Sequence, residues 1–411
     1  KEREREREEK RSVRSALRIV IYCDEYGNEW WPEWGPYSAV EGEGLGGSEE
    51  AVLYLSQELA LLGHQVEIYA NPPSSQYGYH VMKSSSSSSL YNQSSSSSSL
   101  SLSPSSILWC HHTHYNMSNP PDVFISWRYP ISLALGQGAA VRLLWLHDML
   151  PASALPAVIR SYADMILVPS VFHARAVPSV LLDKIQVLPN GLNEDYFING
   201  QNQNHIFVYA SSPDRGLLEV LTLWPLLSTV IRNNRPTSTP MLHVYYGLRS
   251  SVIRSQEQVL GVVEARKWEA TIRRLLNQSG VIYYGSVDHM TLSTGLAAAG
   301  FLLYPTRYPE TSCITVMRAM ALGAIPITSA YTKSVLFNLT YGVDLGPHTV
   351  LTDASESVYQ SWLRLHWGPA VISSALISDA VLHEKRKRMI AMARSNYSWK
   401  RSADMLVELV S

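Results

Sequence analysis

The chain has 411 residues, 46% of them hydrophobic, and its formal net charge at pH 7 is −1. A chain of this length is too long for a single compact core, so we expect two domains of roughly 150–200 residues. The balanced charge excludes the basic surface of a nucleic-acid-binding protein, and without a run of about 18 apolar residues no transmembrane segment is expected. Peripheral contact with a membrane surface stays open.

The cysteines bear on the cellular compartment. Cys23, Cys110 and Cys313 are widely spaced and odd in number. They fit neither a disulfide framework nor the spacing of zinc ligands, which is typical of a reducing compartment. The charged N-terminus does not resemble a secretion signal. We therefore expect a cytoplasmic protein.

The first domain begins after a charged tail. Residues 1–16 contain KEREREREEKR, which has no apolar face and predicts a solvated tail, with a partner-binding arm as the alternative. The segment Leu17–Cys23, LRIVIYC, is rich in β-branched residues and predicts a buried parallel strand. The following GLGGSEEAVLYLSQELALLGHQVEIYA predicts a loop, a helix capped by Ser48 and stopped at Gly63, and a second strand. Such a strand–loop–helix–strand unit is typical of a doubly wound α/β domain.

The remaining chain continues this alternation. Residues 84–106 are mostly serine and predict a disordered surface insertion, with a regulatory phosphorylation segment as the alternative. The polar segment 198–205 predicts a linker between a domain at 17–197 and a second doubly wound domain at 206–385, followed by helices at 386–411. Because many strand-like runs carry polar residues at their C-terminal ends, we predict two Rossmann-like domains that face each other across a ligand cleft.

Eight motifs stand in order along the chain: GLGGSEEAVLYLSQELALLGHQVEIY, LLWLHD, LVPSVFH, VLPNGLNEDYF, YASSPDRGL, YYGSV, YPETSCITVMRAMALGAIPIT and NYSWKRSADMLVELV. Together they resemble the retaining glycosyltransferases of the GT-B fold, in the large family 4 (group 1) class. The resemblance implies transfer of a sugar from a UDP-, GDP- or ADP-sugar to a glycan or other hydroxyl acceptor, without a cofactor. It also implies an acceptor-binding N-terminal domain, a donor-binding C-terminal domain, and a last helix, containing Trp399, that crosses back to the first domain.

Two segments are candidates for binding the donor's diphosphate. Gly46 and Gly47 leave the backbone bare for a close approach to phosphate, with a tight turn as the alternative. Arg215, in SSPDRGL, matches a basic residue of the family and can donate to phosphate oxygens, with an exposed arginine paired to Asp214 as the alternative. A second cation of the family is replaced by Ala-Ser-Ser at 210–212, and we expect the serine hydroxyls to act as neutral substitutes.

The segment YPETSCITVMR supplies the remaining donor contacts. The resemblance implies that Glu310 contacts hydroxyls of the donor sugar, with a first-turn helix glutamate stabilised by the helix dipole as the alternative. Arg318 stands where the family has a second glutamate, and because arginine only donates hydrogen bonds, we expect it to bind ribose hydroxyls or a phosphate. The backbone N–H groups of the helix N-terminus should lie beside the sugar and diphosphate, and they belong to Thr311, Ser312, Cys313 and Ile314.

The end of LLWLHD is a candidate acceptor site. We expect His147 and Asp148 on the acceptor side, with His147 bonding the transferred sugar or the acceptor; a histidine at the edge of the core is the alternative. Glu310, Arg215 and His147 are thus the catalytic candidates.

No metal site is expected. The cluster HHTH (His111, His112, His114) has no added carboxylate and is a weak metal motif, and the chain has no Asp-x-Asp, so we predict a metal-independent reaction. The alternative function is a GT-B protein that binds a nucleotide or glycan without catalysis. An epimerase or phosphorylase is a third alternative, although no cofactor lysine of a phosphorylase is recognisable.

Overall fold

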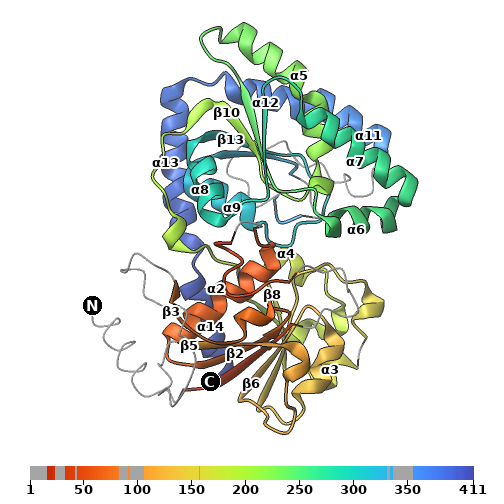
Figure 1. The fold of residues 1–411 in the computed structure, drawn as a ribbon, viewed down its shortest axis with the longest axis vertical. Helices are drawn as coiled ribbons and strands as arrows, with labels where there is room; N and C mark the ends of the chain where they lie inside the picture. Colours follow the sequence, from red (N-terminus) through yellow and green to blue (C-terminus); the bar gives the residue numbers. More distant parts are fainter. Residues whose placement is uncertain are drawn as a thin grey trace.

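The computed structural model describes residues 16–23, 33–41, 44–82, 91–92, 106–156, 158–330, 334–336 and 355–411. These residues form two domains, one above the other in Figure 1, and each is built on a largely parallel β-sheet with helices packed on it. The predicted α/β class, with two doubly wound domains, is therefore confirmed.

In the described part of the N-terminal domain, nine strands form one sheet in the order β4-β3-β5-β2-β1-β6-β7-β8-β9. Its strands run parallel, except that β3 is antiparallel to both β4 and β5. Strand β1 lies inside the sheet, so its Ile19, Val20 and Ile21 are fully buried on both faces. The strands are β1 (Arg18–Tyr22), β2 (Gln65–Ala70), β3 (Gly78–Met82), β4 (Tyr91–Asn92), β5 (Ser106–His111), β6 (Val123–Trp127), β7 (Val141–Trp145), β8 (Met165–Val168) and β9 (Ile185–Val187).

The principal helix of this domain is α2 (Gly47–Leu61). Its N-cap is Gly46 in extended conformation, so the prediction of Ser48 as the cap is wrong by two residues; the Ser48 hydroxyl donates instead to the Glu49 carboxylate over 3.1 Å. The predicted stop at Gly63 is correct, because Gly63 has a φ of 90°, which favours glycine. Two single-turn helices follow, α3 (Ile159–Tyr162) and α4 (Val171–Ala174), and short 3₁₀ turns connect the strands at Ser74–Gln76, His112–His114, Pro130–Gly136, Ala152–Ala154, Ser179–Lys184 and Glu194–Tyr196.

The C-terminal domain has an all-parallel sheet, whose described strands follow the order β12-β11-β10-β13-β14. The first of them begins at Gln203, so the predicted linker 198–205 ends inside a strand. The strands are β10 (Gln203–Tyr209), β11 (Met241–Tyr245), β12 (Val281–Gly285), β13 (Ala299–Tyr304) and β14 (Ile325–Thr328). The helices are α5 (Leu217–Asn234), α6 (Ser250–Leu260), α7 (Val262–Leu276), α8 (His289–Ala298), α9 (Ile314–Leu322), α11 (Glu356–Trp362), α12 (Gly368–Ala375), α13 (Asp379–Asn396) and α14 (Trp399–Val410), with a 3₁₀ turn at Pro213–Arg215 and a π turn at Leu363–Trp367.

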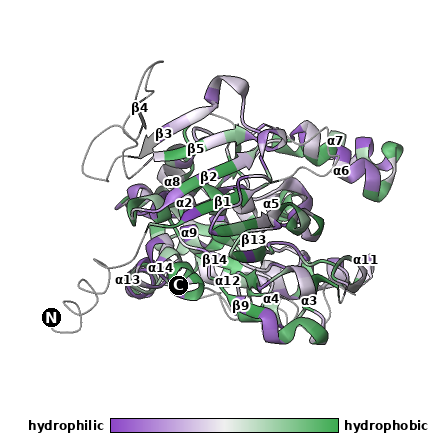
Figure 2. Ribbon diagram, turned by 90° about the horizontal axis from the view of Figure 1, so that it is seen from below, coloured by the Kyte–Doolittle hydropathy of each residue, from purple (hydrophilic) through white to green (hydrophobic). Residues whose placement is uncertain are grey.

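One cluster of buried hydrophobic residues continues from the first domain into the second. Figure 2 shows that the strands of both sheets are mostly hydrophobic, whereas outer helices such as α13 carry hydrophilic stretches. The apolar interface fixes the two sheets relative to each other and places the C-terminal ends of several strands near the domain boundary.

The last helix leaves the C-terminal domain. In Figure 1, α14 lies beside α2 in the lower domain, and the two helices pack together. Gly191 permits this crossing, since a Cβ there would lie 2.2 Å from the backbone nitrogen of Trp399. The Ser402 hydroxyl also donates to the carbonyl of Pro189 over 2.6 Å.

Some predicted segments fall largely outside the described residues. These include nearly all of the tail 1–16 and, from the serine-rich segment 84–106, all but Tyr91–Asn92 in β4 and Ser106 in β5. Within the described ranges, no single helix is long and apolar enough to cross a membrane; one pair bent by 104°, Glu356–Ala375 with Asp379–Asn396, meets that test by length and composition only.

Candidate active site

A cleft of about 550 Å³ lies between the two domains. This volume is in the range of small-molecule binding sites. From the N-terminal domain it is lined by the loop before α2, the first turn of α2 and residues at the ends of β6 and β7. From the C-terminal domain it is lined by the loops after β10, β11 and β12 and by the N-terminus of α9. Ends of parallel strands and two helix N-termini thus converge on one space, as in other open α/β sheets.

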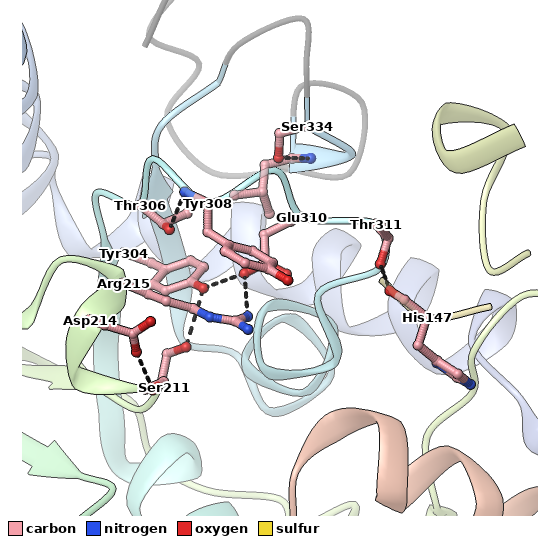
Figure 3. Close-up of polar contacts among 12 residues, drawn as sticks. His147, Ser211, Asp214, Arg215, Tyr304, Thr306, Tyr308, Glu310, Thr311 and Ser334 are labelled. Carbon is pink, nitrogen blue, oxygen red and sulfur yellow. Dashed lines mark hydrogen bonds and ion pairs between the residues drawn. The ribbon is translucent and has the colours of Figure 1, made fainter. Parts of the chain in front are cut away.

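Arg215 and Glu310 form the centre of the C-terminal wall (Figure 3). The Nη1 of Arg215 donates to Oε1 of Glu310 over 2.9 Å, and the guanidinium carbon lies 3.8 Å from the centre of the Tyr308 ring. Burial disfavours the charge of Arg215, but Glu310, together with smaller contributions from Tyr304, Tyr308 and Asp214, outweighs that effect and keeps the arginine pKa well above its usual value. The structure therefore brings these two predicted residues together, and it pairs Arg215 with Glu310 rather than with Asp214.

The same pair is held by a hydrogen-bonded chain. The Tyr304 hydroxyl donates to Oε1 of Glu310, and the Ser211 hydroxyl donates to the Tyr304 oxygen over 3.2 Å. The Ser212 hydroxyl donates to Asp214. Both serines predicted to substitute for a second cation thus bond within the protein, and Ser211 orients Glu310 through Tyr304.

The N-terminus of α9 follows Glu310 directly. Ser312, Cys313 and Ile314 line the cleft, so the helix presents its first N–H groups there. Thr311 does not line it: its hydroxyl donates to the His147 carbonyl over 2.8 Å, and its carbonyl accepts from the Ser170 hydroxyl over 2.6 Å. Both contacts join the two domains beside the cleft.

His147 lies behind the cleft wall. Its ring centre is 4.6 Å from that of Trp145, and Figure 3 shows the ring pointing away from Arg215 and Glu310. Burial lowers the His147 pKa to about 3, so the imidazole is neutral at pH 7. His147 reaches the site through its backbone carbonyl, in agreement with the alternative of a histidine at the edge of the core.

Asp148 does line the cleft, and it has a partner that the sequence did not indicate. The Nε of Arg128 donates to Oδ2 of Asp148 over 2.6 Å, and its Nη1 lies 3.6 Å from Oε1 of Glu49. Burial opposes the Asp148 charge, but the charge and hydrogen bond of Arg128, with smaller contributions from His147 and Arg215, together outweigh it and lower the carboxyl pKa. Since Arg128 follows β6 and Asp148 follows β7, neighbouring strands bring them together.

Two residues with left-handed backbones flank the cleft. Among the described residues, Arg128 with φ 67° and Tyr246 with φ 106° are the non-glycine residues with positive φ, and both line the cleft. Each directly follows a parallel strand, β6 or β11. Such backbone strain clusters at functional sites, and it is the structural signal that local sequence patterns do not contain.

The predicted phosphate loop at Gly46–Gly47 is part of the cleft, but a carboxylate already lies beside it. A Cβ on Gly46 would be 2.2 Å from Oε2 of Glu49, so this side chain folds back over the start of α2. Gly47 faces the other domain, where the nearest atom to an added Cβ is Cδ1 of Ile314 at 3.7 Å. Gly46–Gly47 and the start of α9 therefore form opposite sides of one narrow passage.

Arg318 is buried at the base of the cleft. Its Nη2 donates to Oε1 of Glu50, on α2 of the other domain, over 2.6 Å. The other Glu50 oxygen lies 3.8 Å from Nε2 of His289, whose Nδ1 bonds to the Tyr54 hydroxyl at 2.9 Å. The carboxylate absent at position 318 is thus supplied by the N-terminal domain. Glu50 could not be predicted as this partner from local patterns, because the two residues are 268 positions apart.

Arg249 is a further cleft cation that sequence analysis missed. It follows β11, its Nη2 donates to the Gly44 carbonyl over 2.9 Å, and its Nε donates to the Ser286 hydroxyl over 3.1 Å. Arg249 lies in the short loop between β11 and α6, where no helix or strand periodicity marks it.

No metal-binding group of three or more His, Cys, Asp or Glu side chains occurs among the residues that the structure describes. Within HHTH, the Nδ1 of His111 bonds to the Thr113 hydroxyl at 2.7 Å, which gives that imidazole a structural role.

No protein-family model and no curated protein matches the chain. Solved structures do match. Sucrose-phosphate synthase from Thermosynechococcus elongatus is 14% identical, with a TM-score of 0.59 over 96% of this chain and 98% of its own. A UDP-forming α,α-trehalose-phosphate synthase from Burkholderia xenovorans is 9% identical, with a TM-score of 0.59 over 96% and 99%. HepE from Anabaena, in a complex with UDP and glucose, is 11% identical, with a TM-score of 0.52 over 96% and 99%. At these identities the likeness is one of fold, and the chain has the predicted GT-B fold.

Proposed function

We propose that the protein is a retaining glycosyltransferase, which moves a sugar from a nucleotide-sugar to a hydroxyl acceptor without a metal ion. The observation that carries this proposal is the Arg215–Glu310 pair at the N-terminus of α9, inside the interdomain cleft. Two of the compared proteins are named as a sucrose-phosphate synthase and a UDP-forming trehalose-phosphate synthase, and the structure of the third contains UDP and glucose. Membership of family 4 stays a prediction from the sequence motifs.

Arg215 is proposed to stabilise the leaving diphosphate. Its Nη1 donates to Glu310 and its buried Nε has no hydrogen-bond partner among the described residues, so the guanidinium keeps N–H donors for phosphate oxygens. The Tyr308 ring fixes the plane of the guanidinium. Together with the N–H groups at the start of α9, this supplies the positive charge that the departing diphosphate requires.

Glu310 is proposed to orient the donor sugar through its hydroxyls. Its Oε1 accepts from both Arg215 and Tyr304, which leaves Oε2 as the acceptor for the sugar. Arg318 and Glu50 are proposed to serve the ribose of the same donor, since the pair offers a hydrogen-bond donor beside an acceptor and each ribose hydroxyl can use either.

Retention is proposed to follow a front-face route. The bond between the anomeric carbon and the diphosphate oxygen breaks, the bond to the acceptor oxygen forms on the same face, and the acceptor proton passes to the leaving phosphate. The carboxylate of Glu310 is not proposed as a nucleophile, because Arg215 and Tyr304 already hold it from one side.

The first test is thermal unfolding with UDP, GDP, ADP, CDP and their common sugars, in buffer with EDTA. Ligand at about 100 times its dissociation constant adds roughly 2.7 kcal/mol, which raises Tm by several degrees. We expect one nucleotide family to raise Tm and the matching nucleotide-sugar to be turned over slowly without acceptor. A shift without turnover would favour the non-catalytic alternative, and no shift from folded protein would contradict both.

A further inference from the structure

The two walls of the cleft differ in charge. Among the described cleft-lining residues, the N-terminal domain contributes five carboxylates against one arginine: Glu33, Glu41, Glu49, Glu50, Asp148 and Arg128. The C-terminal domain contributes three arginines against two carboxylates: Arg215, Arg249, Arg318, Asp214 and Glu310. Since Arg318 neutralises Glu50 across the cleft, the N-terminal wall keeps four carboxylates for one arginine.

The N-terminal wall also carries buried acceptor oxygens without a donor. Oε1 of Glu49 and Oε1 of Gln76 have no hydrogen-bond partner among the described residues, and the two residues are 5% and 9% exposed. Both line the cleft. The Glu49 oxygen keeps an ion pair with Arg128 at 3.6 Å but no hydrogen bond. A buried acceptor without a hydrogen bond costs free energy, so each oxygen is suited to a ligand that donates one.

The position of Asp148 brings this wall to the reacting centre. A third of its side chain is exposed, and Arg128 engages its Oδ2. Asp148 follows His147, whose carbonyl accepts from the Thr311 hydroxyl over 2.8 Å, and Thr311 follows Glu310. Asp148, Arg215 and Glu310 all line the same cleft. A molecule bound to the N-terminal wall therefore lies beside the place proposed for the donor's diphosphate.

We infer that the N-terminal wall, on the acceptor side of the proposed glycosyltransferase, selects a sugar without acidic groups, neutral or amino-bearing, over a phosphorylated one. This inference rests on the proposed function. Hydroxyl and ammonium groups donate to the carboxylates of Glu49 and Asp148, which only accept hydrogen bonds, and to the Oε1 of Gln76. A phosphate ester offers only acceptors at these oxygens and meets the surplus negative charge of the wall, while Arg128 is held by Asp148 and Glu49.

The experiment measures UDP release by the full chain from UDP-glucose with three matched acceptors: glucose, glucosamine and glucose 6-phosphate. We expect kcat/KM for glucose or glucosamine to exceed that for glucose 6-phosphate by about tenfold or more. Glu49→Gln and Glu41→Gln should each lower this ratio, because each removes a negative charge from the wall. A change from about 50 to about 500 mM salt should lower it too, because salt screens the repulsion between the wall and the phosphate. Glu264→Gln, on the exposed surface of α7, is the control and should leave the ratio unchanged.

The outcomes separate this inference from the function on which it rests. Equal or better use of glucose 6-phosphate overturns the inference and leaves the glycosyltransferase intact. The inference also fails if neither variant changes the ratio, or if UDP-bound protein responds to none of the three sugars. Glu41 is exposed, so Glu41→Gln keeps the test valid if Glu49→Gln does not fold. Absence of any nucleotide binding overturns the proposed function itself.

Discussion

Arg318 of the C-terminal domain donates to Glu50 of the N-terminal domain over 2.6 Å, and the two side chains are only 8% and 3% exposed. One helix from each domain, α9 and α2, contributes to this contact. A buried charge without its partner is strongly unfavourable, so the pair couples the position of one domain to that of the other. The ribose contact proposed for this pair would therefore require both domains together.

Removal of either partner should destabilise the protein. We expect Arg318→Ala to cost about 3–5 kcal/mol, because it leaves the Glu50 carboxylate buried and unpaired. The double variant Glu50→Arg with Arg318→Glu exchanges the two charges. We expect its free energy of unfolding to recover more than half of that loss, as measured by thermal unfolding in a double-mutant cycle. The control is Lys267→Ala, which removes an exposed ion pair with Glu264 and should cost below about 1 kcal/mol. Equal losses of unfolding free energy in Arg318→Ala and Lys267→Ala would contradict the coupling of the domains through the buried pair.

The buried histidines predict a pH dependence. Burial lowers the pKa of His147 to about 3 and that of His173 to about 4, so in the unfolded chain both bind protons at higher pH than in the folded protein. Their contribution to stability is therefore fully present above about pH 6.5 and is lost as the pH falls below it. Between pH 7 and pH 5 we expect a loss of up to about 2 kcal/mol per histidine.

This loss can be isolated with variants. Chemical unfolding at pH 7 and pH 5 should show a smaller difference for His147→Gln with His173→Gln than for the wild type. His383→Gln changes a histidine exposed on α13 and should leave the difference as it was. The same pH difference in all three proteins would mean that the imidazoles of His147 and His173 are not buried in neutral form.

The left-handed backbone of Arg128 predicts that glycine is more stable than alanine at this position, the reverse of the usual order in a helix. At φ 67°, Arg128→Gly should be more stable than Arg128→Ala by about 1 kcal/mol, since only glycine adopts this region without strain. At Glu384, exposed within helix α13, the order should reverse, because glycine in a helix is less stable than alanine by about 1 kcal/mol. The two pairs are compared by unfolding midpoint in urea. If Arg128→Ala were more stable than Arg128→Gly, the result would argue against a strained left-handed backbone at this position.

The sequence predicted what depends on local pattern. The helix expected to begin just after Glu310 is α9, which ends at Gly323 with a φ of 90° before β14. Arg215 and Glu310 could be predicted because each stands in a recognisable motif. Glu50 could not, since its role arises only when α2 and α9 meet. Arg128 was missed because a left-handed residue after a strand has no side-chain signature of its own.

The last prediction concerns the Arg215–Glu310 pair, which the proposed chemistry needs for two different tasks. If Arg215 stabilises the leaving diphosphate, Arg215→Ala should lower kcat by about 10²–10³, the cost typical of removing one donor to a developing negative charge. Arg215→Lys keeps the charge but loses the Nε donor and the stacking on Tyr308, so we expect only partial recovery.

Glu310→Gln should act mainly on the donor sugar, with weaker binding of the nucleotide-sugar and unchanged affinity for the free nucleotide. Asp214→Asn is the control for the neighbouring carboxylate, which bonds Ser212 instead of Arg215. Single-turnover transfer and nucleotide titration measure these effects separately, and unchanged turnover in Arg215→Ala would remove this pair from the mechanism.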